Sequence, residues 1–297
     1  MALSTRQYST IPQSELDLIL QAGHWNPFMV LGPHQVAAAD GSQVVAIRAF
    51  LPEARKAGVV DLSRGEPGKL TPMEKVHADG FFEAVFPGRS APFPYRLRIE
   101  NHEGHSWESV DPYAFDPILT DFDLHLLGEG THLRNYEKLG AHLTTHQGFR
   151  GVLFAIWAPN AQRVSVVGNF NHWDGRRHQM RSRGGAGIWE LFIPDLCQGE
   201  VYKFEIRSRN HGYTVQKSDP YGLASEVRPK TASVVWDIDR FAWSDDEWMA
   251  RRAERQALDK PMAVYEVHLG SWKRNVEKEN GFLSYQELAE QLVAHLE

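Results

Sequence analysis

The amino-acid sequence predicts a mainly β protein: two tandem immunoglobulin-like β-sandwiches, followed by the first βα unit of a (β/α)8 barrel. Three observations carry this prediction. A pattern of about one hundred residues occurs twice along the chain. Both copies show the two-residue alternation that is typical of half-buried strands. After the second copy, the sequence changes to one apolar run and one amphipathic helix.

The duplication is visible in short stretches that recur in the same order. GFFEAVFP at 80–87 is matched by GIWELFIP at 187–194, 107 residues later. YRLRIE and YKFEIR follow at the same offset, and both copies end on Asp-Pro-Tyr, beginning at Asp111 and Asp219. Aspartate before proline commonly starts a turn, so we expect a turn at each of these positions. Because order and spacing agree over about a hundred residues, the repeat is a duplicated domain and not a short solenoid unit.

The strands of each copy are expected to be antiparallel, with one face buried and the other in water. YKFEIR puts an aromatic or aliphatic residue at every second position and a charged one between, as in such strands. Short strands separated by Gly, Pro and Asn are typical of a β-sandwich. Cys197 is the only cysteine, so these sandwiches lack the disulfide of many immunoglobulin domains.

The predicted organisation has six segments. In chain order they are a tail with a short helix (1–23), the first sandwich (24–125), a connector (126–145), the second sandwich (146–235), a linker with some helix (236–260), and the first strand and helix of a truncated barrel (261–297).

Helix and strand signals outside the repeat are local. Ser14, with Asp17 three positions later, predicts a capped helix over 14–22. The apolar run 261–272 predicts a strand, and Ser284 and the glutamate three residues on predict a capping box for the last helix. A complete barrel needs about 250 residues, so one βα unit cannot close a core by itself.

Composition excludes several classes of protein. The chain is 42% hydrophobic with a net charge of −6, which argues against disorder and against nucleic acid as a partner. There is no run of 18 apolar residues and no signal peptide, so we expect a cytoplasmic protein with no membrane partner. Histidines at 142 and 146 lack further ligands at metal-binding spacing, so no metal and no cofactor are expected.

Four motifs resemble parts of bacterial 1,4-α-glucan (glycogen) branching enzymes, and the resemblance covers the whole chain. They are HWNPFMVLGPH at 24–34, LLGEGTHLRNYEKLGAH at 126–142, GNFNHWDGRRHQM at 168–180 and YEVHLGSWKR at 265–274. The third is similar to the signature loop of carbohydrate-binding module family 48. The fourth is similar to the opening strand of a glycoside hydrolase family 13 barrel.

The resemblance implies a retaining transfer reaction, in which an α-1,4-glucan chain is cut and passed to a sugar 6-hydroxyl to form an α-1,6 branch. Such chemistry needs two carboxyls about 5 Å apart. In the family these lie on later barrel strands, and no motif here matches them, so no catalytic residue is assigned. The expected partners are α-1,4-glucan or glycogen and the remainder of the barrel, and we expect a monomer that binds without catalysing.

The resemblance also implies a sugar site in the second sandwich. Trp173 and Lys203 match a stacking aromatic and a hydroxyl-binding lysine, Asn171 precedes Trp173 in the same loop, and Tyr213 falls near a second stacking position where tryptophan is usual. Interdomain packing of this face against the barrel remains open beside glucan binding. The first sandwich has VVDLSRGEPGK in place of this loop, so we expect packing or spacing there.

Two other functions stay open. One is a stand-alone glucan-binding or regulatory protein, although such a protein has no use for a single barrel strand. The other is a related family 13 debranching enzyme or trehalose-releasing hydrolase. Those enzymes usually carry a single such module, so the duplication and the wording YEVHLGSWKR favour the branching enzyme.

Overall fold

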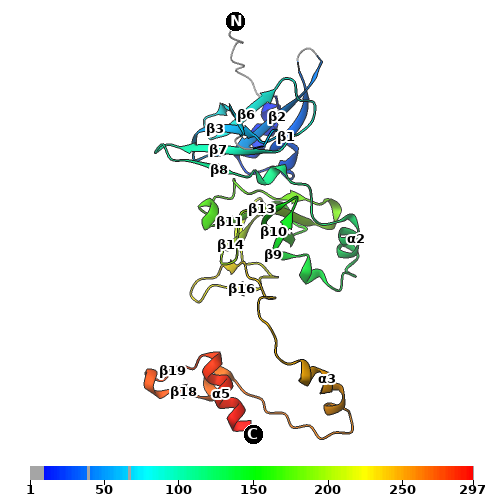
Figure 1. Ribbon diagram of the computed structural model, residues 1–297, viewed down its shortest axis with the longest axis vertical. Coiled ribbons are helices and arrows are strands. Elements are labelled where there is room, and N and C mark those ends of the chain that lie inside the picture. The colour runs from blue at the N-terminus through cyan, green and yellow to red at the C-terminus, as the bar shows by residue number, and fades with distance from the viewer. Residues whose placement is uncertain (1–9, 39–40, 66–67, 297) are drawn as a thin grey trace. The chain divides into compact units, whose positions relative to one another are not determined.

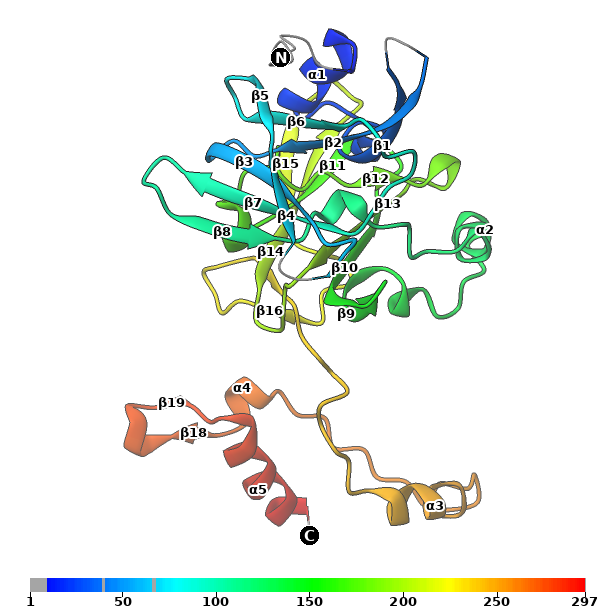
Figure 2. The same ribbon diagram turned by 45° about the horizontal axis from the view of Figure 1, so that its top comes forward.

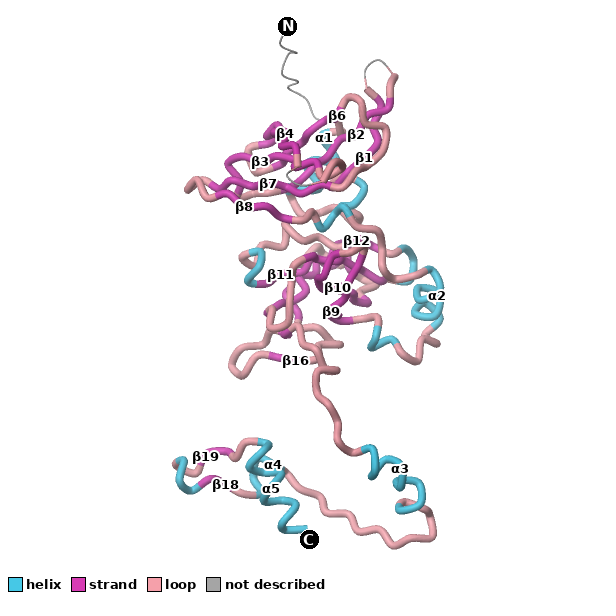
Figure 3. Tube along the Cα trace, viewed as in Figure 1, coloured by secondary structure: helices cyan, strands magenta, loops and turns pink. Residues whose placement is uncertain are grey.

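The computed structural model describes residues 10–38, 41–65 and 68–296 (Figure 1). The chain divides into two compact units, Met1–Arg240 and Phe241–Glu297. Strands predominate in the first unit, as Figure 3 shows in magenta, and the predicted mainly β class is confirmed.

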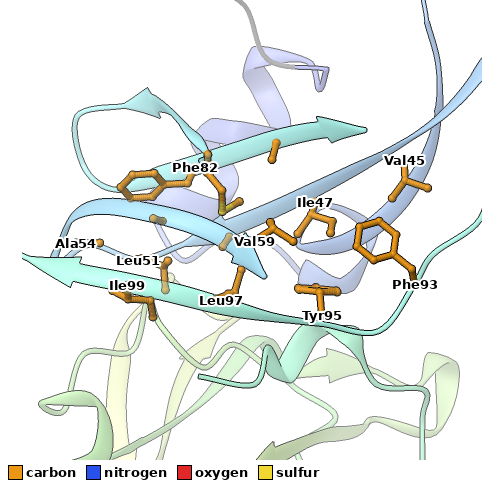
Figure 4. Packing of buried hydrophobic residues seen from close by; sticks show 14 residues of the cluster. Val45, Ile47, Leu51, Ala54, Val59, Phe82, Phe93, Tyr95, Leu97 and Ile99 are labelled. Atoms are coloured by element: carbon orange, nitrogen blue, oxygen red, sulfur yellow. The ribbon is translucent and has the colours of Figure 1, made fainter. Parts of the chain in front are cut away.

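Two four-stranded antiparallel sheets form the first sandwich, with strand orders β1-β2-β6-β5 and β4-β3-β7-β8. The strands are β1 Gly32–Ala37, β2 Gln43–Phe50, β3 Ala54–Asp61, β4 Lys69–Pro72, β5 Glu74–His77, β6 Phe81–Phe86, β7 Tyr95–Asn101 and β8 Ser106–Ser109. Apolar side chains of both sheets meet between them, among them Ile47, Val59, Phe82 and Leu97 (Figure 4). This core follows from the alternation seen in the sequence.

The second sandwich repeats this plan. Its sheets have the orders β12-β13-β10-β9 and β11-β14-β17-β16, and β15 pairs with β14. The strands are β9 Gly140–His146, β10 Phe149–Trp157, β11 Ala161–Gly168, β12 Arg181–Ser182, β13 Ile188–Pro194, β14 Val201–Ser208, β15 Thr214–Lys217, β16 Ala224–Ser225 and β17 Ser233–Val234. Phe154, Trp189, Tyr202 and Phe204 are buried between the sheets. Strand β9 begins at Gly140, inside the segment expected to be a connector, because it pairs with β10.

The repeated Asp-Pro-Tyr stretches hold matching contacts. Asp111 Oδ1 accepts the Tyr113 amide at 2.9 Å, and Asp219 Oδ1 accepts the Tyr221 amide at 2.8 Å, so both aspartates start turns as predicted. Each aspartate also accepts a hydrogen bond from a buried tyrosine at the start of the preceding repeated strand: Tyr95 for Asp111 at 2.6 Å and Tyr202 for Asp219 at 2.5 Å. The sequence did not predict these tyrosine contacts.

The first helix differs from its prediction. Helix α1 spans Gln13–Leu20, and the residue before it is Pro12, so Ser14 lies inside the first turn and does not cap it. The Pro12 carbonyl accepts the amides of Glu15 and Leu16, while Asp17 accepts the side-chain amide of Gln13 at 2.8 Å. The predicted Ser14 cap is therefore wrong, because the helix begins before Ser14 and Asp17 accepts the Gln13 side chain instead.

A second helix, α2 (Asp121–Glu129), covers one face of the second sandwich. A capping box between Thr120 and Asp123 begins it, and Gly130 in a left-handed conformation ends it. Its Leu124 and Leu127 pack against Ile188 and the other residues of a small cluster on the sheet with β10 and β13. Figures 1 and 2 show α2 beside this sheet.

Hydrogen bonds and an ion pair join the two sandwiches within the first unit. The Tyr113 hydroxyl donates to the Arg177 carbonyl at 3.1 Å and accepts the Gln179 amide at 3.0 Å. Arg177 also lies 2.8 Å from the Glu53 carboxylate. These contacts attach the loop after β11 to the first sandwich.

The second unit contains α3 (Asp246–Arg255), α4 (Leu269–Trp272), β18 (Arg274–Asn275), β19 (Gly281–Phe282) and α5 (Tyr285–Leu296). The capping box of the last helix is confirmed, since the side chains and amides of Ser284 and Glu287 bond reciprocally. The strand predicted over 261–272 is wrong. Residues 261–268 are irregular and mostly exposed, because no described strand of this unit lies alongside to pair with them.

Within the described residues, no helix has the length and apolar character that crossing a membrane requires.

Candidate functional site

The residues predicted to bind glucan lie on or beside the outward face of β14. Alternation along this strand points Tyr202 and Phe204 into the core and leaves Lys203, Glu205 and Arg207 on the other face. The neighbouring strand β11 runs antiparallel to β14, with Val167 opposite Lys203. The loop that leaves β11 at Gly168 then folds back beside this face.

Asn171 is the internal support of this loop. Its side chain has no exposed surface. Its Oδ1 accepts the Gly168 amide at 2.9 Å, and its Nδ2 bonds the Val166 carbonyl at 2.8 Å and His178 Nδ1 at 2.9 Å. Burial lowers the pKa of His178 to about 3, so its ring is neutral and can accept this bond. Asn171 therefore shapes the loop, and the structure does not support its predicted contact with sugar.

Trp173 is displayed by a strained turn. Both His172 and Trp173 have positive φ, at 55° and 60°, a conformation that non-glycine residues rarely adopt. The Trp173 amide donates to the Gly168 carbonyl at 3.0 Å, and its indole N–H donates to Asn169 Oδ1 at 3.0 Å. These hydrogen bonds hold the partly exposed indole ring at the surface. Backbone strain of this kind is common at ligand sites.

Lys203 lies at the same end of the sheet as Trp173. Gly168, which holds the Trp173 amide, is opposite Tyr202, the residue before Lys203. The Lys203 ammonium donates to Thr231 Oγ1 at 2.8 Å and remains partly exposed. An ammonium and a hydroxyl side by side offer hydrogen bonds that suit sugar hydroxyls.

Tyr213 is not part of this group. Its carbonyl accepts the Ser208 amide at 2.9 Å, which places it at the far end of β14 from Lys203. The β15 residue nearest the Lys203 level on the outward face is Gln216, opposite Glu205, and it is not aromatic. The structure therefore places Trp173 and Lys203 at one end of β14 and Tyr213 at the other.

The carboxylates near the site are already paired. Glu205 accepts Arg163 at 2.7 Å and Gln216 at 3.2 Å. Asp174 accepts a hydrogen bond from Arg176 at 2.7 Å. Burial favours a higher pKa for Asp174, but the hydrogen bonds from Arg176 outweigh the effect of burial, so the pKa of Asp174 is lowered. Both carboxylates are thus engaged by arginine side chains, an arrangement that suits binding and not proton transfer.

Two known families match the chain. Residues 12–113 match the alpha-1,4-glucan branching enzyme GlgB N-terminal domain. Residues 138–222 match carbohydrate-binding module 48, described as the isoamylase N-terminal domain, and include Trp173, Lys203 and Tyr213. Among solved structures, a pullulanase from Anoxybacillus sp. LM18-11 is 17% identical with a TM-score of 0.31, covering 67% of this chain and 27% of that chain. That similarity is too low to add to the assignment.

Curated relatives agree with these two matches. The chain is 46% identical over 286 residues to the 1,4-alpha-glucan branching enzyme GlgB of Roseobacter denitrificans, covering 96% of this chain and 38% of that protein. It is 51% identical over 282 residues to the enzyme of the same name from Paramagnetospirillum magneticum, covering 95% and 36%. The chain thus spans less than two fifths of the length of these relatives. It corresponds to the N-terminal part of proteins named 1,4-alpha-glucan branching enzyme GlgB: it carries their N-terminal domain and a carbohydrate-binding module 48.

Proposed function

We propose that this chain is the glucan-binding front part of a 1,4-α-glucan branching enzyme, and that it binds α-1,4-glucan or glycogen through Trp173 and Lys203. The arrangement of these two side chains at one end of the sheet carries the proposal. The flat indole face suits the apolar face of a pyranose ring. Lys203 and Thr231, 2.8 Å apart, suit the hydroxyls at its edge.

The fragment itself binds without catalysing. A retaining transfer needs two carboxyls about 5 Å apart, one of them a nucleophile and one an acid and base. The carboxylates beside Trp173 and Lys203 are instead bound to arginines. The cutting of an α-1,4 chain and its transfer to a 6-hydroxyl therefore belong to a (β/α)8 barrel, with which this chain would act. The free, exposed Cys197 supports a reducing cytoplasm as the location, and we further propose that the chain is a monomer.

Affinity electrophoresis in gels containing glycogen tests the site. Trp173→Ala is expected to reduce retention strongly and Lys203→Met to reduce it moderately, because the first removes the stacking surface and the second a charged donor. Trp107→Ala, which removes a partly exposed tryptophan of the first sandwich, is the matched control and should leave retention unchanged.

Equal retention of the Trp173→Ala variant and the parent chain, with an unchanged melting temperature, would contradict binding at this site. Trp173 would then have the alternative role of packing against the barrel.

A further inference from the structure

The loop that displays Trp173 is held by both sandwiches. It runs from Gly168, where β11 ends, to Arg181, where β12 begins. Its first half is held within the second sandwich by the hydrogen bonds of the buried Asn171. Its second half, residues 176–179, also contacts the first sandwich and helix α1. Since Trp173 lies between these two halves, the position of its ring depends on both.

The Tyr113 hydroxyl is the central contact from the first sandwich. It accepts the Gln179 amide at 3.0 Å and donates to the Arg177 carbonyl at 3.1 Å. The ring that carries it is buried and packs edge-on against Phe28, with 5.0 Å between centroids. Beside it, the Arg177 guanidinium forms an ion pair with Glu53 at 2.8 Å. A hydroxyl on a packed, buried ring is a rigid point of attachment for the loop.

Gln179 is attached through its side chain as well as its backbone. The side chain has no exposed surface. Its Nε2 donates to the Ile19 carbonyl in α1 at 3.3 Å and to the Arg176 carbonyl in the loop at 3.0 Å. A buried amide that lost these partners would leave polar atoms unsatisfied, which is costly. This part of the loop therefore has one favourable position relative to the first sandwich and α1.

Arg176 extends the attachment toward Trp173. Its guanidinium lies over the ring of Phe50, at the end of β2, 5.8 Å from the ring centre. Asp174 accepts the Arg176 amide at 2.9 Å and its guanidinium at 2.7 Å. Asp174 directly follows Trp173. A continuous set of contacts thus runs from the first sandwich to the residue next to Trp173.

The backbone at Trp173 needs such support because it is strained. His172 and Trp173 have positive φ, at 55° and 60°. Residues in this conformation keep it only where the surrounding structure restrains them. If the second half of the loop were released, the turn could relax to ordinary dihedral angles, and the indole would lose its fixed orientation.

We propose that the first sandwich positions the sugar-binding loop of the second, with Tyr113 as the main positioning residue and Glu53 as a further one. Neither residue touches glucan in this role. They raise the affinity by keeping the loop in the geometry in which Trp173 stacks on a sugar ring, because affinity scales with the fraction of chains that hold the competent geometry. This role rests on the proposed function of Trp173.

Isothermal titration of the 297-residue chain with maltoheptaose tests the proposal. Tyr113→Phe removes the hydroxyl and keeps the packed ring. It should weaken the affinity about fivefold, because the loop then holds its binding geometry for only a fraction of the time. Tyr221→Phe is the matched control, since Tyr221 occupies the equivalent place in the second repeat and packs in the cluster under α2. It should leave the affinity unchanged.

Hydrogen exchange on the same chains separates positioning from a general loss of stability. In Tyr113→Phe, the amides of Gln179 and Trp173 should exchange faster, while the amides of β10 and β13 keep the rates of the parent. Glu53→Gln removes the charge of a partly exposed side chain and keeps its size. It should weaken the affinity about twofold, and it carries the test if Tyr113→Phe impairs folding.

Parent affinity in folded Tyr113→Phe and Glu53→Gln chains, where Trp173→Ala weakens binding, would overturn the positioning role and leave the Trp173 site standing. A weaker affinity without faster exchange at the Trp173 amide would overturn it as well, since the hydroxyl would then act elsewhere. If Trp173→Ala itself leaves the affinity unchanged, the Trp173 site fails and the positioning role fails with it.

Discussion

Two tyrosine–aspartate hydrogen bonds occupy equivalent places in the two halves of the repeat, Tyr95 with Asp111 and Tyr202 with Asp219. Burial raises the pKa of Asp111 to about 6, although the hydrogen bonds from Tyr95 and the Tyr113 amide oppose it; burial raises the pKa of Asp219 in the same way. A carboxyl with a raised pKa binds a proton more tightly in the folded state than in the unfolded chain. Its favourable contribution is therefore present at low pH and is lost as the pH rises.

Replacing Asp111 by Asn tests this linkage. The Asn oxygen can still accept the Tyr113 amide, and its NH2 group can donate to the Tyr95 hydroxyl oxygen, but the side chain no longer titrates. The free energy of unfolding of the parent, relative to Asp111→Asn, should fall by up to about 3 kcal/mol as the pH rises from about 4 to about 7. Urea unfolding at several pH values measures it, and a constant difference between the two proteins would contradict the assignment.

The strands of both sandwiches were predictable from sequence because the two-residue alternation and the repeat report local chain geometry. The site was predictable only in part. Trp173 and Lys203 lie at the same end of β14, but Tyr213 lies at the other end because of the register of β14 with β15, which the sequence does not reveal. Contacts between residues far apart in sequence, such as Arg48 with the buried Glu83 at 2.9 Å, are likewise set by strand pairing. The strand predicted at 261–272 failed because pairing, and not local pattern, makes a strand.

At the level of the secondary-structure elements, β6 and β13 occupy equivalent places in the two sandwiches, and each is preceded by a glycine that no other residue can replace without strain. Gly80 precedes β6 and Gly187 precedes β13, with φ of 100° and 71°. A β-carbon on Gly80 would stand 2.4 Å from the Leu51 carbonyl oxygen, and one on Gly187 would stand 2.7 Å from Pro159 Cα. Both the backbone conformation and the close approach of a neighbouring backbone exclude a side chain there.

Gly80→Ala should therefore destabilise the chain by about 3 kcal/mol, since the conformational strain and the clash with backbone combine. Gly104 has a similar φ of 91° but open space around its β-carbon position, so Gly104→Ala is the matched control and should cost only about 1 kcal/mol. Thermal or urea unfolding measures the difference, and equal losses in the two variants would refute the packing argument.

The first unit of the molecule, up to Arg240, contains two copies of one sandwich plan, and the second unit contains helices α3, α4 and α5 and the hairpin of β18 and β19. The duplication has kept the strand plan and the buried Tyr–Asp pairs in both halves. Only the second half has the loop that displays Trp173, because the first half lacks an equivalent insertion after β3. We accordingly propose glucan binding for the second sandwich, which is joined to the first through contacts such as Arg177 with Glu53.

The most direct test of this assignment is an NMR titration of the chain with maltoheptaose, following the indole N–H signals of its nine tryptophans. Single substitutions would identify each signal. The signal of Trp173 should shift and saturate, and that of Trp107 in the first sandwich should stay in place. A Trp173 signal that does not move while maltoheptaose binds would contradict the proposed glucan site.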